Sequence, residues 1–371
     1  MSTSTFDPRP LTEPIDRAAV AAHRKELLAA GRLPSGGGGT VGIVIAVAVF
    51  LFVGFFILNV FISLLTSFAR TGGSPVSIGF VVVVAVMAVG IISLIVRGVK
   101  ASHTRIYRLD RFARANGLTW FAKASNPPLP GMIFSRGSSR TASDILRGER
   151  PRFVEFANYR FTTGSGKNRT THRWGYVAIK LATPLPHIVL DAEGNNGLFG
   201  SNLPQVFDKD QRLSLEGDFD RHFALYCPQG YEQDALYLFT PDIMARFIDH
   251  AAQLDVEIVD DWLFLYAKRD FSTLDPNTWA WLFSVVGALL DKLAQWERWR
   301  DDRLTQSATA AAASGTLPFA PPVEALRPPP GVAAGGQRLK TGIPWAAIVV
   351  VGVFAVGFFA LQSGIFGAFF R

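Results

Sequence analysis

Cysteine is almost absent from this chain, because Cys227 is the only one among 371 residues. A single thiol excludes an intramolecular disulfide framework. Exported domains more often carry paired cysteines, so the composition favours a reducing compartment for the central part of the chain. Cys227 has no His or Asp partner at a spacing that indicates a catalytic nucleophile.

Charged residues are missing from three long apolar runs, residues 41–69, 77–96 and 344–370, and the second predicted span, 77–97, ends with the flanking Arg97. About 20 apolar residues in a helix suffice to cross a hydrocarbon core of ~30 Å. The sequence therefore predicts three transmembrane helices. A cleavable signal peptide fits the first run poorly, since a segment of 40 residues precedes it.

Lysine and arginine are distributed unevenly around these runs. They are frequent in the N-terminal segment, residues 1–40, and directly after the second run, whereas Arg70 alone lies between the first two runs. Positive flanks are retained on the cytoplasmic side of a membrane. The prediction is a multi-pass protein of the cell membrane whose N-terminus and central domain are cytoplasmic.

Residues 98–304 have the composition of a globular domain with a core of its own. Residues 152–163 and 171–183 read as two strands of a hairpin, and residues 256–260 and 262–268 as another. The second apolar run is predicted to continue as a helix through residues 101–115, and further helices are predicted from Pro241 and from Pro276 to about residue 303. The predicted fold class is α+β: a cytosolic, mainly antiparallel sheet domain with flanking helices, anchored by the three transmembrane helices. Residues 305–342, rich in Ala, Pro and Gly, are predicted to form a disordered linker.

A Gly-Ser-Gly-Lys run at residues 164–167 raises the question of a phosphate-binding loop. Such a loop needs a glycine five positions before the Gly-Lys pair and Ser or Thr after it. Phe161 and Asn168 stand there instead. We interpret the run as the tip of the first hairpin.

Acidic residues and a histidine gather in the segment Glu-Gly-Asp-Phe-Asp-Arg-His. In an extended chain Asp218, Asp220 and His222 would share one face, as metal ligands can. Asp218 also suits the N-cap of a short helical turn, in which these side chains would diverge. Together with Asp191 they form a speculative ligand or metal cluster, and no cofactor is predicted.

Charge separates along the central domain. Residues 101–180 contain 15 basic and 4 acidic residues, and residues 181–305 contain 10 and 21. Basic residues beside a membrane span attract anionic lipid head groups. The predicted contacts with such a surface are Arg105, Arg108, Arg111, Arg114, Lys167 and Arg169. The acidic half would repel phosphates, which argues against a nucleic-acid partner.

The helix predicted from Pro276 carries an apolar seam, whose residues recur at alternating spacings of three and four: Trp279, Leu282, Val286, Leu289, Leu293 and Trp296. Such a seam either packs on the domain's own sheet or, alone or with the small residues Ala360 and Gly364 of the last apolar run, pairs with a second copy. Both readings stay open at this stage.

The segments "PPLPGMIF", "LPHIVLDAEGNN" and "DQRLSLEGDFDRHFALYCPQGYEQDALYLFTPDIMARFID", together with the first hairpin, resemble an uncharacterised domain-of-unknown-function family. Its members are bacterial integral membrane proteins of GC-rich Gram-positive lineages. The resemblance covers residues 98–304. It implies a membrane setting and supplies no reaction.

Two function classes follow from these features, and a third is weaker. The first is a membrane-tethered cytosolic binding or scaffold module, with a protein partner or another ligand, which needs no catalysis. The second is a membrane-bound enzyme, hydrolase-like or metal-assisted, with its site near Asp218 and His222. The third is an accessory subunit of a membrane transport complex, although the apolar runs contain no ionisable group that would mark a solute pathway.

Overall fold

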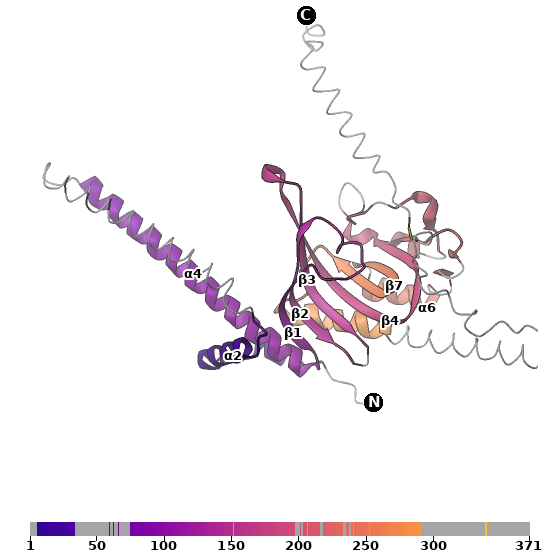
Figure 1. Ribbon diagram of the computed structural model, residues 1–371, viewed down its shortest axis with the longest axis horizontal. Helices are drawn as coiled ribbons and strands as arrows, with labels where there is room; N and C mark the ends of the chain where they lie inside the picture. The colour runs from indigo at the N-terminus through magenta and orange to yellow at the C-terminus, as the bar shows by residue number, and fades with distance from the viewer. Residues whose placement is uncertain are drawn as a thin grey trace, which may run out of the picture. The chain divides into compact units, whose positions relative to one another are not determined.

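The computed structural model describes residues 6–33, 59, 62, 66, 75–150, 152–196, 201, 203–205, 207–215, 218–232, 235–236, 239, 241–251, 253–290 and 338–339. The chain divides into two compact units (Figure 1). Unit 1 comprises Met1–Lys123 with the short pieces Ser143–Arg147 and Leu274–Pro276, and unit 2 comprises the rest.

The helices of unit 1 are α1 at Arg9–Thr12, α2 at Arg17–Ala29 and α4 at Pro75–Ala115. The Asp16 side chain caps α2 by accepting a hydrogen bond from the main-chain N–H of Ala18 at 3.0 Å. Helix α4 stops where the sequence predicts. Gly117 has a φ of +70°, a backbone conformation that glycine adopts readily at a helix end.

The prediction of three transmembrane helices is wrong for the part of the chain that the structure describes. None of the described helices combines the length and the apolar composition that a membrane span requires. The run at 77–97 belongs to α4, a single helix of 41 residues whose second half is charged. Apart from three isolated helical residues, the run at 41–69 lies outside the described residues, as does all of 344–370. The predictions of a membrane-anchored fold and of a multi-pass localisation are corrected accordingly.

The strands form one antiparallel arrangement in the order β1-β2-β3-β4-β6-β5, with β7 also paired to β4 (Figure 1). Their bounds are β1 Thr119–Ser125, β2 Ser138–Gly148, β3 Val154–Thr163, β4 Thr170–Ala192, β5 Arg212–Leu213, β6 Phe223–Tyr226 and β7 Asp255–Ala267. The long strand β4 organises the sheet, because β3 and β6 pair with successive parts of it while β7 pairs along most of its length.

Short helical segments fill the connections of unit 2. The 3-10 turns are η1 Gly166–Asn168, η2 Glu193–Asn195, η3 Lys209–Gln211 and η4 Phe219–Arg221. The helix predicted from Pro241 is confirmed as α6 Pro241–Arg246, and it continues as the π-helical turn η5 Phe247–Ala251.

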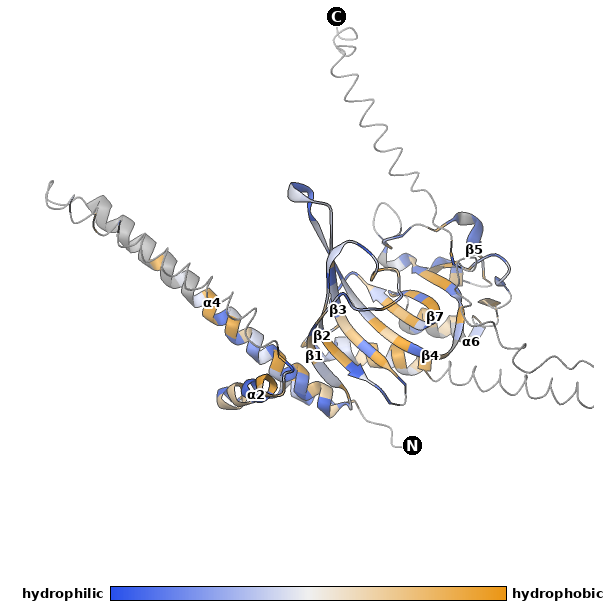
Figure 2. Ribbon diagram, viewed as in Figure 1, coloured by the Kyte–Doolittle hydropathy of each residue, from blue (hydrophilic) through white to orange (hydrophobic). Residues whose placement is uncertain are grey.

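The first predicted hairpin is confirmed. Strands β3 and β4 pair in continuous register from Val154↔Ile179 to Thr163↔Thr170. The Gly-Ser-Gly-Lys run lies at the tip, where Gly164 has a φ of +77° and Lys167 belongs to the exposed turn η1. Figure 2 shows this tip as hydrophilic and the strands below it as largely hydrophobic.

The second predicted hairpin is wrong, because residues 256–260 and 262–268 belong to one strand, β7. Asp260 reads as a turn residue in the sequence. In the structure it has a φ of +54°, and the pairing of β7 with β4 shifts register on either side of the Leu185↔Asp260 pair. A bulge therefore replaces the turn, and the strand continues through it.

The two faces of the sheet are buried by different parts of unit 2. On one face, the Phe156 ring contacts those of Trp279 and Phe283 at centroid distances of 5.7 and 5.5 Å. On the other face, the Phe134 ring contacts those of Tyr159 and Tyr176, each at 4.9 Å. The core of unit 2 is therefore aromatic on both sides of β3 and β4.

The helix predicted from Pro276 is helical over residues 276–290, and its remainder lies outside the described residues. Four seam residues, Trp279, Leu282, Val286 and Leu289, are at most 6% exposed. This part of the seam is therefore buried within the chain. Pairing with a second copy stays a prediction for the part that is not described.

Candidate functional site

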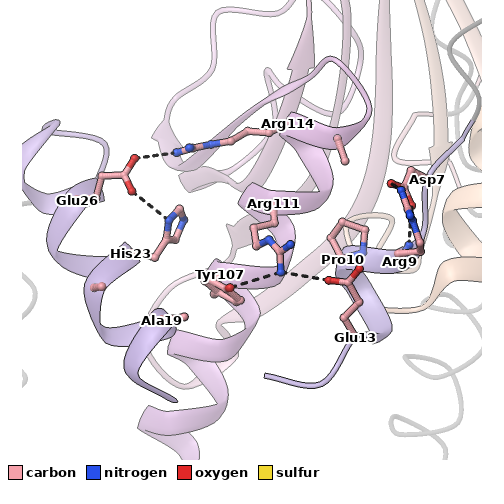
Figure 3. Close-up of a pocket in the computed structure, with 12 residues that line it drawn as sticks. Asp7, Arg9, Pro10, Glu13, Ala19, His23, Glu26, Tyr107, Arg111 and Arg114 are labelled. Atoms are coloured by element: carbon pink, nitrogen blue, oxygen red, sulfur yellow. Dashed lines mark hydrogen bonds and ion pairs between the residues drawn. The ribbon is translucent and has the colours of Figure 1, made fainter. Parts of the chain in front are cut away.

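A pocket of about 670 Å³ lies within unit 1, between α1, α2 and α4 (Figure 3). Tyr107, Arg111 and Arg114 of α4 line it at spacings of four and three residues, which place them on one helix face. Ala19, Ala22, His23 and Glu26 line it from α2 with the same periodicity. Asp7, Arg9, Pro10 and Glu13 complete the lining from the segment around α1, and Ala115 from the end of α4.

The N-terminal segment is held against the end of α4 by a pair of hydrogen bonds. The main-chain N–H of Asp7 donates to Asn116 Oδ1 at 2.9 Å, and Asn116 Nδ2 donates back to the Asp7 carbonyl at 3.0 Å. The Phe6 and Phe112 rings meet edge to face beside this pair. The asparagine that ends α4 thus also fixes one wall of the pocket.

A buried carboxylate, Asp110, holds α2 and the chain after it against α4. Its side chain is fully buried, and its Oδ1 accepts a hydrogen bond from Arg32 Nη2 at 2.8 Å. Its Oδ2 lies 2.8 Å from Arg114 Nε and 3.0 Å from His23 Nε2, with the geometry of ion pairs rather than of aligned hydrogen bonds. A buried charge is tolerated only when it is paired in this way.

The charged side chains that line the pocket all have partners. Arg111 Nη1 lies 3.3 Å from Glu13 Oε2 and 3.4 Å from the Tyr107 hydroxyl, to which it donates. Glu26 lies 3.4 Å from Arg114 Nη2 and 3.5 Å from His23 Nδ1. Figure 3 shows these side chains meeting over the surface of α4.

Asp7 and Arg9 form the shortest of the lining pairs, with Arg9 Nη2 2.7 Å from Asp7 Oδ2. The hydrogen bond from Arg9 is the main cause that lowers the pKa of Asp7 to about 2, against a weaker opposing effect of desolvation. Asp7 therefore stays ionised at every physiological pH.

The arginines predicted to contact a lipid surface make contacts inside the protein. Arg105 Nη2 lies 2.8 Å from Asp144, and Arg108 Nη2 donates to the Glu13 carbonyl at 3.0 Å. Arg111 and Arg114 line the pocket. Lys167 and Arg169 lie on the exposed hairpin tip of unit 2. A lipid-contact role for these six residues stays a prediction.

The predicted ligand or metal cluster lies in unit 2 and is spread over two elements. Asp218 and His222 flank the turn η4, whose N-cap position Asp218 occupies as predicted. Asp220 in the turn accepts hydrogen bonds from the Ser214 hydroxyl and from the main-chain N–H of Leu215. Within the ranges that the structure describes, no three His, Cys, Asp or Glu side chains are grouped as metal ligands.

Asp191, the fourth residue of that cluster, is buried on β4. Desolvation raises its pKa to about 6, and hydrogen bonds from Ser201 and Asn196 partly oppose the shift. Its main chain pairs with that of Ala224 on β6. A carboxyl group with such a pKa can carry a proton at mildly acidic pH.

Sequence reasoning missed the N-terminal half of the pocket. Asp7, Arg9, Glu13, His23 and Glu26 lie in a segment that was considered only for its charge. The signal that could have found them is the Asp16 cap followed by apolar and small residues at helical spacing, which predicts a helix over 17–29. Which face of α4 it covers is decided by contacts such as Arg32–Asp110, 78 residues apart.

Comparisons with known proteins give little further information. No protein-family model matches the chain, and no curated protein matches it. Among solved structures, the chain is similar to the crystal structure of the mycobacterial trehalose monomycolate transport factor A, with a TM-score of 0.35 and 11% identity. That similarity covers 51% of this chain and 93% of the other.

Proposed function

We propose that this protein is a non-catalytic binding module, and that the pocket of unit 1 receives an acidic group of its ligand. The observation that supports this is that Glu13 and Glu26 form only weak ion pairs with Arg111 and Arg114. Both contacts are long, 3.3 and 3.4 Å, and the glutamate side chains are 40% and 60% exposed.

A ligand carboxylate or phosphate can replace these glutamates at small cost. Exposed ion pairs contribute about 0.2–1 kcal/mol, whereas charge-assisted hydrogen bonds at shorter distance are roughly twice as strong as neutral ones. A guanidinium offers five N–H donors in a planar fork that matches carboxylate and phosphate oxygens. Glu13 and Glu26 occupy positions that the acidic group of a ligand would take.

Arg114 is oriented for this task by Asp110. Its Nε lies 2.8 Å from the buried Asp110 carboxylate, so this ion pair restrains the position of the guanidinium while the side chain remains 49% exposed. Restraint of a binding group before the ligand arrives lowers the entropy lost on binding. The arrangement favours binding over catalysis, because each acid that lines the pocket is paired with a base.

The proposal is tested by titrating the full-length protein with citrate and, separately, with inorganic phosphate in a calorimeter at low salt. Arg111→Gln and Arg114→Gln should each weaken binding of the anion by about tenfold, the loss of roughly 1.4 kcal/mol expected for a charged hydrogen bond. Arg105→Gln is the matched control, since Arg105 pairs with Asp144 and does not line the pocket.

Glu13→Gln provides a test of opposite sign. Removing the carboxylate that competes for Arg111 should tighten anion binding by about two- to fivefold, within the range expected for an exposed ion pair. Binding of neither anion by the wild type, or equal weakening by all three arginine substitutions, would refute the proposal.

A further inference from the structure

A dipeptide from the C-terminal part of the chain, Arg338–Leu339, lies on unit 2 at strands β4 and β7. Arg338 Nη2 donates to Asp260 Oδ2 at 2.9 Å, and the main-chain N–H of Leu339 donates to His187 Nδ1 at 3.3 Å. Leu339 is only 5% exposed. The dipeptide is therefore held by a charge, by a main-chain hydrogen bond and by burial of an apolar side chain.

The imidazole of His187 is oriented to accept the Leu339 hydrogen bond. A main-chain N–H can only donate, so Nδ1 is the acceptor and the proton of the neutral ring is on Nε2. Nε2 then donates to Glu257 Oε1 at 3.0 Å. Both His187 and Glu257 are buried, at 7% and 1% exposure.

Glu257 is itself fixed by two further donors on its other oxygen. The main-chain N–H of Met132 and the Tyr266 hydroxyl each donate to Oε2 at 2.7 Å. Gly131 makes this approach feasible, because a Cβ there would lie 2.0 Å from the Tyr266 hydroxyl oxygen. The acceptor that faces Leu339 is thus supported by a chain of buried hydrogen bonds.

Asp260 is directed toward Arg338 by the β7 bulge. Asp260 has a φ of +54°, which is unfavourable for a residue other than glycine, and such conformations persist where the surrounding structure requires them. The next residue, Asp261, pairs with Lys180 at 2.6 Å instead. The two adjacent aspartates on β7 therefore have different partners, and of the two it is Asp260 that binds the dipeptide.

We propose that His187 and Asp260 form a recognition site for an Arg-Leu dipeptide, here named the Arg-Leu socket, and that Arg338–Leu339 is its occupant. The socket binds three groups of that dipeptide: the arginine guanidinium, the main-chain N–H of the leucine and the apolar leucine side chain. Because the occupant belongs to the same chain, the socket is an internal anchor that ties Arg338–Leu339 to the sheet.

Trypsin tests the proposal directly, since it cleaves after arginine and the bond between Arg338 and Leu339 is the one that the socket holds. The full-length protein is digested at a low trypsin ratio, and cleavage after Arg338 is followed by mass spectrometry. The rate of cleavage after Lys167, on the exposed hairpin tip, is the internal reference (the clock) to which the rate after Arg338 is compared.

Asp260→Asn should accelerate cleavage after Arg338 by about tenfold relative to the clock, and Leu339→Ala should do the same. Asparagine tolerates positive φ, so the first substitution leaves the bulge intact. Asp261→Asn is the matched control and should change the rate by less than about twofold. Equal rates in the wild type and Asp260→Asn, or equal acceleration by Asp261→Asn, would overturn the proposal.

Deuterium exchange of the unmodified protein gives an independent test. The Leu339 amide should exchange at least about tenfold more slowly than an unstructured amide, because it is hydrogen-bonded and buried. Exchange of this amide at the unprotected rate would overturn the proposal. In the variants, amides of β7 should keep their protection, so that a local release is distinguished from unfolding.

Discussion

We expect the buried carboxylate of Asp191 to destabilise the protein at neutral pH, so its replacement by asparagine should make the protein more stable. The carboxyl is 4% exposed on β4. Its pKa is about 6 in the folded protein, chiefly because of desolvation, against a reference value of 3.8. The difference of about 2.2 units corresponds to roughly 3 kcal/mol, at 1.36 kcal/mol per unit.

The direction in which stability changes with pH follows from the number of protons bound by the folded and the unfolded chain. Below pH 3.8 the carboxyl is protonated in both the folded and the unfolded chain, and it contributes no pH dependence. Between 3.8 and about 6 the folded chain keeps a proton that the unfolded chain has lost, so stability falls as the pH rises. Above about pH 6 the whole penalty applies. An asparagine has nearly the same shape and no charge, so it should remove this penalty.

The assay is urea unfolding of the full-length protein, followed by tryptophan fluorescence at pH 8 and at pH 4. Asp191→Asn should raise the free energy of unfolding by about 1–3 kcal/mol at pH 8, after an allowance of about 1 kcal/mol for the buried amide. At pH 4 the gain should nearly vanish. Asp270→Asn, at an exposed carboxylate, should change stability by less than about 0.5 kcal/mol at either pH. Equal gains of Asp191→Asn at pH 4 and pH 8, or a loss at pH 8, would refute the reasoning.

Three further variants test the structure of unit 2, each by urea unfolding at pH 7. Gly175→Ala should cost at least about 1–3 kcal/mol, because the new Cβ would lie 2.4 Å from the Phe271 ring, and an unchanged midpoint would contradict that contact. Glu257→Ala should cost about 3–5 kcal/mol, since three buried partners lose their acceptor; a cost below 1 kcal/mol would show that water replaces the carboxylate. Lys167→Ala combined with Arg169→Ala should change stability by no more than about 0.5 kcal/mol, as expected at an exposed tip, and unfolding of that variant would contradict the turn.

Local sequence patterns predicted the structure correctly where neighbouring residues alone determine the conformation. The β3–β4 hairpin follows from two runs of β-branched and aromatic residues around a glycine-rich turn. The end of α4 follows from the Asn116-Gly117 pair, because glycine relieves the backbone strain of a left-handed helix end. In both cases the energetic cause lies within a few residues of the feature.

Predictions from sequence patterns were wrong where the same local sequence is compatible with two different structures. Asp260-Asp261 suits a turn as well as a bulge, and only the long pairing of β7 with β4 selects the bulge. Apolar runs suit a membrane span or a packed helix, and composition alone does not choose between them. The described part of α4 is one long helix with a charged half, in which the second apolar run continues directly into the helix predicted at 101–115.

The sequence by itself determined the local elements of this protein and the basic and acidic balance of its two halves. Only the tertiary structure decided the partners of the charged groups. Asn116 meets Asp7 across 109 positions, and Leu339 meets His187 across 152. Ion pairs and buried hydrogen bonds depend on distances of about 3 Å between side chains, and residues so far apart in sequence come that close only through the packing of helices and strands. The pocket of unit 1 and the Arg-Leu socket are consequences of that packing.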